Sequence, residues 1–380
     1  MSTFPTRRLG KNGPLVSAIG LGAMGIGAYY GKIDETAAHN ALTYAADRGI
    51  TLWDTSDMYG ESEAILGKWF AKTGRRSEIF LATKWGAMDF SQTDPAKQHQ
   101  ANSKPAYIRE RVKASLAALQ TDYIDLYYQH RVDAEVPIEI VLETLRPYVE
   151  SGTIRWLGLS ECNVDTLKRA RAVKGLGEKV VAVQMEFSPF ELEIEKNGFA
   201  KAAEEAGVAV VCYSPLARGL VSGRFRSPDD FDQDDIRRWL PRFSAENFPK
   251  NLEAVDKIKA IADKHNATPS QVTLAWILAS HDNFIPIPGT RNAERLAENS
   301  RGAELKLSPT DVKEIRDLLE SADVGGGRYP DGVPLPTGEC IPLSEWKGED
   351  PRVENNHKSH SLKGRFQQWT SKCTKNSTKA

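Results

Sequence analysis

Ile124-Asp-Leu-Tyr-Tyr-Gln129 is a short, mostly apolar run that predicts a β-strand. A helical pattern follows over Ile138–Val149 and stops at Ser151-Gly152, and Ile154-Arg-Trp-Leu-Gly-Leu159 then predicts a second strand. A strand, a helix and a strand in this order place two parallel strands side by side under a covering helix.

The same unit recurs along the chain. Most of the strand patterns are apolar throughout, which is typical of parallel strands buried on both faces. The eight expected strands are residues 15–20, 51–54, 79–84, 124–129, 154–159, 180–184, 208–213 and 283–288. Such alternation fits a closed (β/α)8 TIM barrel or an open doubly wound sheet. Because no second domain interrupts the eight units, we predict an α/β fold of one domain, a (β/α)8 TIM barrel over residues 7–330.

Composition narrows the class of function. The 380 residues carry 50 Lys and Arg against 51 Asp and Glu, a net charge of −1, which gives no strong field for nucleic acid or an anionic membrane. Apolar runs are too short to cross a bilayer, and the start lacks the apolar core of a secretory signal. The four cysteines are widely spaced, which argues against a disulfide framework or a zinc site. We expect a cytoplasmic protein that binds neither nucleic acid nor membrane, and a monomer by default.

Two segments are expected to lie outside the barrel's regular elements. Arg218–Pro249 is rich in Arg, Asp and Pro and is interpreted as a long surface loop. Residues 341–380 hold few aliphatic side chains, and no acidic residue follows Glu354. We interpret this polar, basic C-terminal tail as disordered, because so little apolar surface cannot offset the entropy of ordering. A basic interaction arm is the less favoured alternative.

A glycine-rich run suggests a nucleotide fold but does not fit one. Gly20-Leu-Gly-Ala-Met-Gly25 matches the G-x-G-x-x-G pattern after a strand. In a dinucleotide-binding fold this motif opens a helix directly, with an acidic residue roughly 20 positions further on. Here the next helix is expected only at Asp34, and Asp54 stands too far along the chain. We therefore interpret the run as a sharp turn at the mouth of the barrel.

Polar side chains stand where the expected strands end. Asp54, Lys84 and His130 close the second, third and fourth strands, and Tyr59 lies in the loop after the second. Alone, each has an ordinary explanation, such as a solvated strand end or half-buried packing. In a barrel, however, all strand ends of this kind meet at the face that carries active sites. Four groups suited to acid–base work at one mouth favour an active site.

These residues resemble motifs of the aldo-keto reductase superfamily. The matching segments occur in the family's order between Arg7 and Tyr329, and the resemblance is nearest to the bacterial and fungal NADP-dependent oxidoreductases, with their pyridoxal and aryl-aldehyde reductases. The segments are Asp54-Thr-Ser-Asp-Met-Tyr-Gly60, Lys84, His130, Gly158-Leu-Ser160, Tyr213-Ser-Pro-Leu216, Pro288-Gly-Thr-Arg291, Arg295 and Glu298-Asn299. The resemblance implies a (β/α)8 barrel, which agrees with the strand pattern.

The resemblance implies that Asp54, Tyr59, Lys84 and His130 form a catalytic tetrad. Carbonyl reduction needs hydride at carbon and a proton at the developing alkoxide, so a positioned general acid is required. Tyr59 suits that role once Lys84 lowers its pKa from about 10, while Asp54 keeps the lysine charged. His130 can donate a hydrogen bond to the carbonyl oxygen.

The resemblance also implies a nicotinamide cofactor, NADP(H), that supplies the hydride. Tyr213 would stack on the nicotinamide, and Arg295 with Arg291 would pair with a 2′-phosphate. One departure stands out, because much of the family has Asn where this chain has Glu161, whose role is left open. The implied cofactor-binding residues are Ser160, Gln184, Tyr213, Ser214, Leu216, Gly219, Gly289, Thr290, Arg291, Arg295, Glu298 and Asn299.

The expected activity is therefore reduction of an aldehyde or ketone, with a small-molecule carbonyl compound as the partner and no metal. The alternative is a barrel that binds nucleotide but mainly serves a protein partner, as in the channel β-subunit branch, with little turnover. A barrel hydrolase is weaker still, since no metal-ligand cluster or nucleophile elbow supports it. Neither the substrate nor the direction of the reaction can be predicted.

Overall fold

The computed structural model describes residues 3–28, 34–233, 235–330, 332 and 337–352. Eight parallel strands form one sheet in the order β10-β9-β8-β7-β6-β5-β4-β3, so the order along the chain is the order in space. The strands are β3 (Leu21–Gly22), β4 (Leu52–Asp54), β5 (Phe80–Trp85), β6 (Ile124–Gln129), β7 (Ile154–Ser160), β8 (Val180–Glu186), β9 (Ala209–Tyr213) and β10 (Phe284–Pro286). Every residue of β6 and β8 is buried, as expected for strands covered on both faces.

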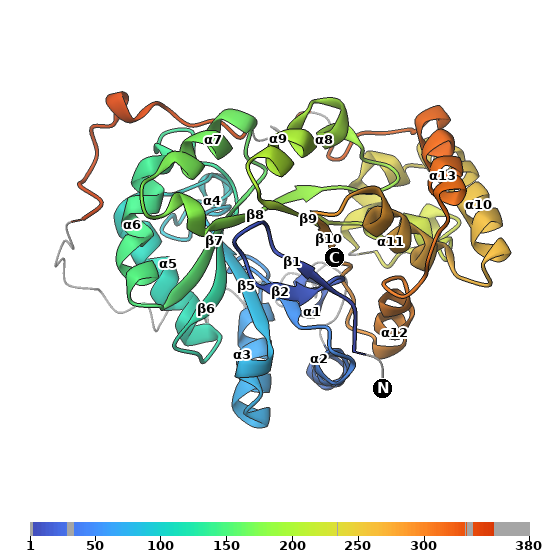
Figure 1. The fold of residues 1–380 in the computed structure, drawn as a ribbon, viewed down its shortest axis with the longest axis horizontal. Coiled ribbons are helices and arrows are strands. Elements are labelled where there is room, and N and C mark those ends of the chain that lie inside the picture. The colour runs from blue at the N-terminus through green and yellow to red at the C-terminus, as the bar shows by residue number, and fades with distance from the viewer. Residues whose placement is uncertain (1–2, 29–33, 234, 331, 333–336, 353–380) are drawn as a thin grey trace, which may run out of the picture.

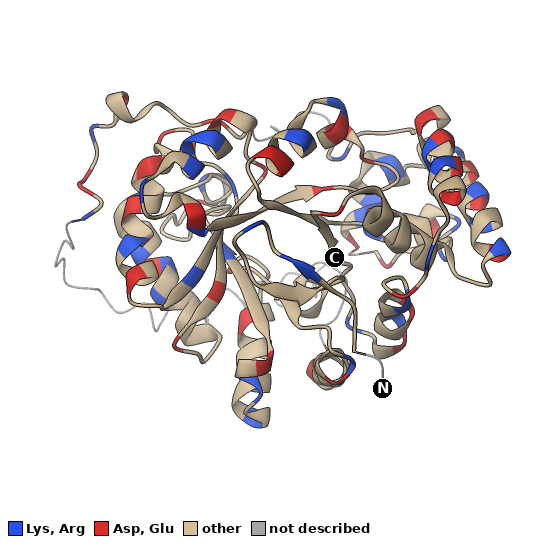
Figure 2. Cartoon of the chain, viewed as in Figure 1, with Lys and Arg blue, Asp and Glu red and all other residues tan. Residues whose placement is uncertain are grey.

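Helices surround the sheet on its outer face (Figure 1). They are α1 (Met24–Gly27), α2 (Glu35–Arg48), α3 (Ser62–Thr73), α4 (Pro95–Gln98), α5 (Pro105–Ala118), α6 (Ile138–Glu150), α7 (Val164–Ala172), α8 (Glu193–Lys196), α9 (Phe199–Glu205), α10 (Asn247–Lys264), α11 (Pro269–Ser280), α12 (Ala293–Arg301) and α13 (Pro309–Ser321). Acidic and basic residues are interspersed along these helices and are sparse on the strands (Figure 2). In the part of the chain that is described, no helix combines the length and apolarity that a membrane span needs.

The first and last strands close the barrel. Gly22 forms a parallel bridge with Gly289, and the Gly20 amide donates to the Pro286 carbonyl at 2.9 Å. A Cβ on Gly22 would lie 2.8 Å from the Ile287 carbonyl oxygen, so this crossing has no room for a side chain. The predicted (β/α)8 barrel is confirmed, and this part of the glycine run serves its closure.

The first barrel strand was predicted at the wrong place. Leu15–Ser17 is β2, which pairs antiparallel with β1 (Thr6–Arg8) in a separate hairpin. Leu9 and Val16 of this hairpin are buried against strand residues inside the barrel, and the Lys11 amide donates to the carbonyl of Gly207, just before β9. The hairpin therefore covers the amino-terminal end of the barrel, and the true first strand is β3. The glycine run also leads into the short helix α1, earlier than the helix expected at Asp34.

The segment 218–249 is more than a surface loop. Among its described residues, short 3-10 helices lie at Ala217–Ser222, which begins one residue earlier, and at Pro228–Asp230, Ile236–Trp239 and Pro241–Phe243. Phe231, Phe243 and Phe248 are buried in a cluster that includes Val255 of α10. An aromatic core of its own therefore holds this segment on the barrel.

Part of the expected C-terminal tail is ordered against the outer helices. The Gly338 carbonyl accepts hydrogen bonds from Asn163 and Thr166 at the start of α7, and Arg169 donates to the carbonyls of Cys340 and Ile341. Glu349 accepts from the Ala106 amide of α5 at 2.7 Å. Of the tail expected to be disordered, residues 341–352 are described, and Ile341 and Glu349 contact the outer helices. Residues 353–380 lie outside the described part.

Candidate active site

The four residues at the strand ends meet at one place. Asp54 ends β4, Lys84 lies near the end of β5, and His130 directly follows β6. The Tyr59 ring stands edge-on to the His130 ring at a centroid distance of 5.7 Å, and Lys84 Nζ lies 5.0 Å from the centre of the Tyr59 ring. The structure therefore brings together an acid, an amine, a phenol and an imidazole from three separate segments of the chain.

Lys84 and Asp54 form a buried ion pair. Lys84 Nζ lies 2.5 Å from Asp54 Oδ1 and also donates to the Thr55 carbonyl at 2.7 Å. The other Asp54 oxygen accepts from the Gln184 amide at 2.8 Å. Burial raises the pKa of Asp54 and lowers that of Lys84, while their mutual attraction opposes both shifts. Each charge is retained in the interior because the other stands beside it.

His130 is held in its neutral form. Burial, with the nearby positive charges of Arg131 and Lys84, lowers the pKa of His130 well below its ordinary value. Its Nδ1 lies 2.9 Å from the Ser56 hydroxyl, which also accepts a hydrogen bond from the Met58 amide at 3.3 Å. A neutral imidazole carries its hydrogen on one ring nitrogen, so the partner of Nδ1 determines what Nε2 can do.

A second buried charge cluster supports the loop that carries Ser56 and Tyr59. Asp57 binds Arg111 Nε of α5 at 2.9 Å, and Glu63 of α3 accepts from the Thr83 hydroxyl at 2.6 Å. Burial raises the pKa of Asp57 to about 6 and, together with the charge of Asp57, raises that of Glu63 to about 7. Asp57 therefore ties the loop between β4 and α3 to α5, and Glu63 ties the start of α3 to β5.

Three of the expected cofactor contacts stand on adjacent strands. Ser160 ends β7, Gln184 lies in β8 opposite Ser160 in the strand register, and Tyr213 ends β9. Ser160 and Gln184 are buried, whereas Tyr213 is partly exposed. The Tyr213 hydroxyl donates to Glu161 Oε1 at 2.9 Å. Glu161, whose role the sequence left open, therefore contacts the tyrosine that is expected to stack on the nicotinamide.

Ser214, Leu216 and Gly219 lie in the tight turn that follows β9. Ser214 has a φ of 50° and Gly219 a φ of 94°, and the Gly219 amide donates to the Leu216 carbonyl at 2.9 Å. The left-handed turn leads directly into the segment with the aromatic core. It therefore forms one wall at the carboxyl end of β9.

The remaining expected contacts surround the start of α12. Gly289 is the closure glycine, and the Thr290 hydroxyl accepts from the amide of Asn292, the residue that caps α12. Glu298 pairs with Arg224, and Asn299 is buried. Burial and the neighbouring charges of Arg224, Arg237 and Arg291 lower the pKa of Arg295. Arginines from two segments thus concentrate positive charge near the amino end of one helix.

Comparison with known proteins identifies the family. The model of the aldo/keto reductase family matches residues 18–320, most of the chain. The chain belongs to the aldo/keto reductase family.

Relatives in this family match nearly end to end. "Aldo-keto reductase yakc" of Schizosaccharomyces pombe, whose name also specifies NADP(+), is 48% identical over 335 residues, covering 87% of this chain and 96% of the relative. "Aldo-keto reductase str7" of Strobilurus tenacellus is 44% identical over 86% of this chain and 95% of its own. "Probable aldo-keto reductase 1" of Glycine max is 38% identical over 86% of this chain and 92% of its own. This aldo/keto reductase is therefore an oxidoreductase with a (β/α)8 barrel fold.

Several residues at this aldo/keto reductase's site were missed from the sequence. Ser56, Asp57 and Arg111 carried no signal of their own, although Ser56 and Asp57 lie inside the motif that includes Tyr59. Arg131 donates to the His130 carbonyl at 2.8 Å and to the Ser160 hydroxyl at 3.4 Å. Arg328 lies beyond the segment that the family model matches and still reaches Tyr213. Only its position in space reveals it.

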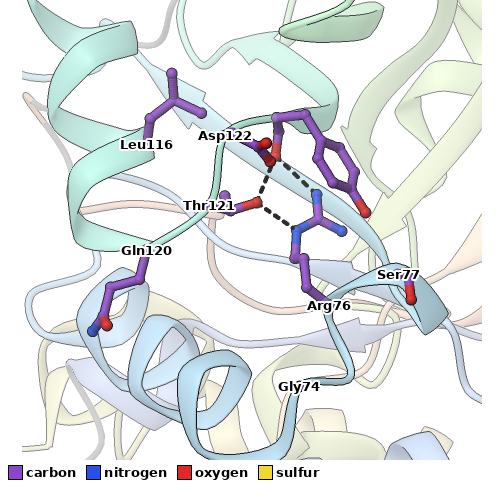
Figure 3. Close-up of a pocket in the computed structure, with 8 residues that line it drawn as sticks. Gly74, Arg76, Ser77, Leu116, Gln120, Thr121 and Asp122 are labelled. Atoms are coloured by element: carbon purple, nitrogen blue, oxygen red, sulfur yellow. Dashed lines mark hydrogen bonds between the residues drawn. The ribbon is translucent and has the colours of Figure 1, made fainter.

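An open hollow of about 690 Å³ lies at the other end of the barrel (Figure 3). It is formed where the chain enters β5 and β6, and Arg76 crosses it to bind the Thr121 hydroxyl at 3.2 Å and the Tyr123 carbonyl at 2.9 Å. Its lining residues are Gly74, Arg76, Ser77, Leu116, Gln120, Thr121, Asp122 and Tyr123. Because barrel active sites lie at the carboxyl ends of strands, we assign no chemistry to this hollow.

Proposed function

We propose that this oxidoreductase reduces the carbonyl group of an aldehyde or ketone with NADPH, and that Asp54, Tyr59, Lys84 and His130 perform the chemistry. The observation that carries the proposal is the buried Lys84–Asp54 ion pair beneath the Tyr59 ring, with His130 beside it. A charged amine in the interior needs a strong reason to be there, since burying it costs several kcal/mol, on the order of what its partner returns. Stabilising a phenolate is such a reason.

The proton is delivered by Tyr59. A phenol with a pKa of about 10 is a poor acid near neutral pH, and an adjacent ammonium stabilises its anion. Lys84 supplies that charge, while Asp54 and the Thr55 carbonyl fix the direction of the amine. Protonating the alkoxide is the step in which a positioned acid contributes most, on the order of 10² to 10⁴ in rate.

His130 orients the carbonyl oxygen. The Ser56 hydroxyl has one hydrogen, and His130 Nδ1 at 2.9 Å is nearer than the alternative acceptors, Asp57 Oδ1 at 3.4 Å and the Lys84 carbonyl at 3.5 Å. Donation to Nδ1 leaves the ring hydrogen on Nε2. In this tautomer Nε2 donates to the substrate oxygen, which polarises the carbonyl and places it near Tyr59.

The residues around the mouth fit NADP(H), whose chemistry when bound is to carry the hydride. Ser160 and Gln184 present hydroxyl and amide groups suited to a carboxamide, and the Tyr213 ring offers a stacking face. Arg295 and its neighbouring arginines suit a 2′-phosphate, because guanidinium groups bind phosphate with two parallel hydrogen bonds. The concentration of positive charge there favours NADP(H) over NAD(H).

Replacement of Tyr59 by Phe tests the proposal. We expect carbonyl-dependent NADPH oxidation by the purified protein to fall by about 10² to 10⁴ while NADPH affinity is retained. A panel of aldehydes, ketones and pyridoxal serves as substrates, and Tyr44→Phe, a change on the outer helix α2, is the matched control. Unchanged turnover in the Tyr59 variant would show that another group delivers the proton.

A further inference from the structure

We propose that Glu161 and Arg328 form a clamp on the Tyr213 hydroxyl that holds the ring as a platform for the nicotinamide, so that the segment after α13 contributes to cofactor affinity. The inference rests on the proposed function and extends it to two residues that the family resemblance does not assign. Its starting observation is a set of contacts among three segments far apart in the sequence.

The Tyr213 hydroxyl is held from two sides. Arg328 Nη2 donates to it at 2.6 Å, and it donates to Glu161 Oε1 at 2.9 Å. The same Arg328 nitrogen also lies 3.0 Å from Glu161 Oε1, which closes the triangle. A tyrosine fixed only by packing can rotate about its side-chain bonds, whereas two bonds at its tip restrict the plane of the ring.

Arg328 is itself held in place. Its Nε donates to Glu186 Oε2 at 2.8 Å, and Glu186 is a buried residue at the end of β8. Arg242, from the segment with the aromatic core, lies 3.9 Å from the other oxygen of Glu186 and pairs with Glu191 at 2.8 Å. The guanidinium group of Arg328 therefore connects the ends of β7, β8 and β9 through its contacts with Glu161, Glu186 and Tyr213.

The backbone of Glu161 supports a specific role for its carboxylate. Glu161 has a φ of 51°, in the left-handed region that favours Gly and Asn, so its side chain persists there against a conformational cost. Its Oε1 is compensated by Tyr213, Arg328 and the Glu186 amide at 3.3 Å. Burial alone would raise the pKa of Glu161, but the guanidinium groups of Arg328 and Arg131 outweigh it and keep the group ionised.

The side chain of Glu161 is engaged with Tyr213 and Arg328. Much of the family has Asn at this position, whereas here the carboxylate turns to Tyr213 and Arg328. Ser160 and Gln184 remain on the adjacent strands as the polar groups suited to a carboxamide.

A double-mutant cycle on NADPH affinity tests the clamp. The dissociation constant of NADPH is measured for the full chain by energy transfer from protein tryptophans to the reduced nicotinamide, which requires no turnover. We expect Tyr213→Phe and Arg328→Met each to raise it about 3- to 10-fold, the range that loss of one hydrogen bond of ordinary net strength produces. Because both changes remove the same interaction, the double variant should bind no more weakly than the worse single variant.

Two further variants guard against a general loss of structure. Arg316→Met is the matched control, since Arg316 is equally buried and binds both oxygens of Glu195 far from the strand ends. It should leave NADPH affinity unchanged. Glu161→Gln keeps the shape and loses the charge, so it should weaken binding in the wild-type background and have no effect in the Tyr213→Phe background. If Arg328→Met does not fold, Arg328→Lys replaces it in the cycle.

The outcomes separate the clamp from the proposed function. Two results would overturn the clamp even if the wild type reduces carbonyl compounds. One is a double variant whose rise in the NADPH dissociation constant is the product of the two single rises, and the other is unchanged NADPH affinity in the single variants. A wild type that binds NADPH and reduces none of them would overturn the proposed function and leave the clamp supported by the cycle. A wild type that does not bind NADPH would overturn both.

Discussion

Ser56 shows how much one hydroxyl can determine. It stands between the Met58 amide and His130 Nδ1, with both contacts inside the protein. If its hydrogen points to Nδ1, His130 is a donor toward the substrate, and if it points to Asp57, His130 is an acceptor. The 2.9 Å and 3.4 Å distances favour the first arrangement.

We therefore expect Ser56→Ala to remove the hydrogen bond that keeps the ring hydrogen of His130 on Nε2, so that both neutral tautomers are populated. Turnover should fall by roughly 5- to 10-fold, the effect of one hydrogen bond of about 1 kcal/mol, and NADPH affinity should hold. Nitrogen-15 NMR of the imidazole should show Nε2 protonated in the wild type and a mixture in the variant. Ser56→Thr keeps the hydroxyl and should restore both; a wild-type tautomer in Ser56→Ala would contradict the assignment.

Glu63 makes stability depend on pH. Its pKa is raised to about 7 in the fold, so between its ordinary value of 4.5 and about 7 the folded protein holds a proton that the unfolded chain has released. The free energy of unfolding therefore falls as pH rises through this window. Glu63→Gln is neutral at every pH and still accepts from Thr83. We expect urea unfolding to show a gain in its stability relative to the wild type from pH 5 to pH 8, and a constant difference would contradict the raised pKa.

At the scale of elements, the closure of the barrel between β3 and the residues after β10 leaves no room for a side chain at Gly22. We expect Gly22→Ala to lower the free energy of unfolding by about 1–3 kcal/mol, because the new Cβ would overlap the Ile287 carbonyl oxygen. Urea unfolding measures the change. Gly327→Ala is the control, since its Cβ would meet ordinary contacts only and should change stability by less than about 0.5 kcal/mol.

Helix α12 carries Arg295, the residue proposed to pair with the 2′-phosphate of NADP(H). Arg295 lies in its first turn, close to Arg224, Arg237 and Arg291. We expect Arg295→Met to weaken NADPH binding by about 10- to 100-fold and to leave NADH binding nearly unchanged, as loss of a charge-assisted pair with phosphate would. Fluorescence titration with both nucleotides measures the ratio. An equal loss for NADH would place Arg295 away from the 2′-phosphate.

Elements with strong local signals were predicted well. Asp34 caps α2 through the Ala37 amide, Gly49 ends that helix in the left-handed conformation, and β6 spans the predicted Ile124–Gln129. Two-residue β3 has no periodicity to detect, so the neighbouring apolar run was chosen in its place. Cys340 and Ile341 are held through their backbone carbonyls, which no side-chain pattern reports.

At the scale of the whole molecule, the part of the candidate site that follows from the order of the strands could be predicted from the sequence. Once the strands are parallel and consecutive, Asp54, Lys84 and His130 must end on one face. Arg328 was not predictable, because its contact depends on the path of the segment after α13 across the barrel. The tautomer of His130 was not predictable either, since it depends on tenths of an ångström around Ser56.

The pairing of Gly22 with Gly289 also bears on how the protein is made. During synthesis the first strand leaves the ribosome long before its closing neighbour is made, so the barrel cannot close until the chain has emerged as far as Gly289. Contacts between such distant segments form slowly because a large loop must first be closed. The nascent chain would thus spend time as an open, curved sheet with one unpaired edge strand, a form that a molecular chaperone can shield.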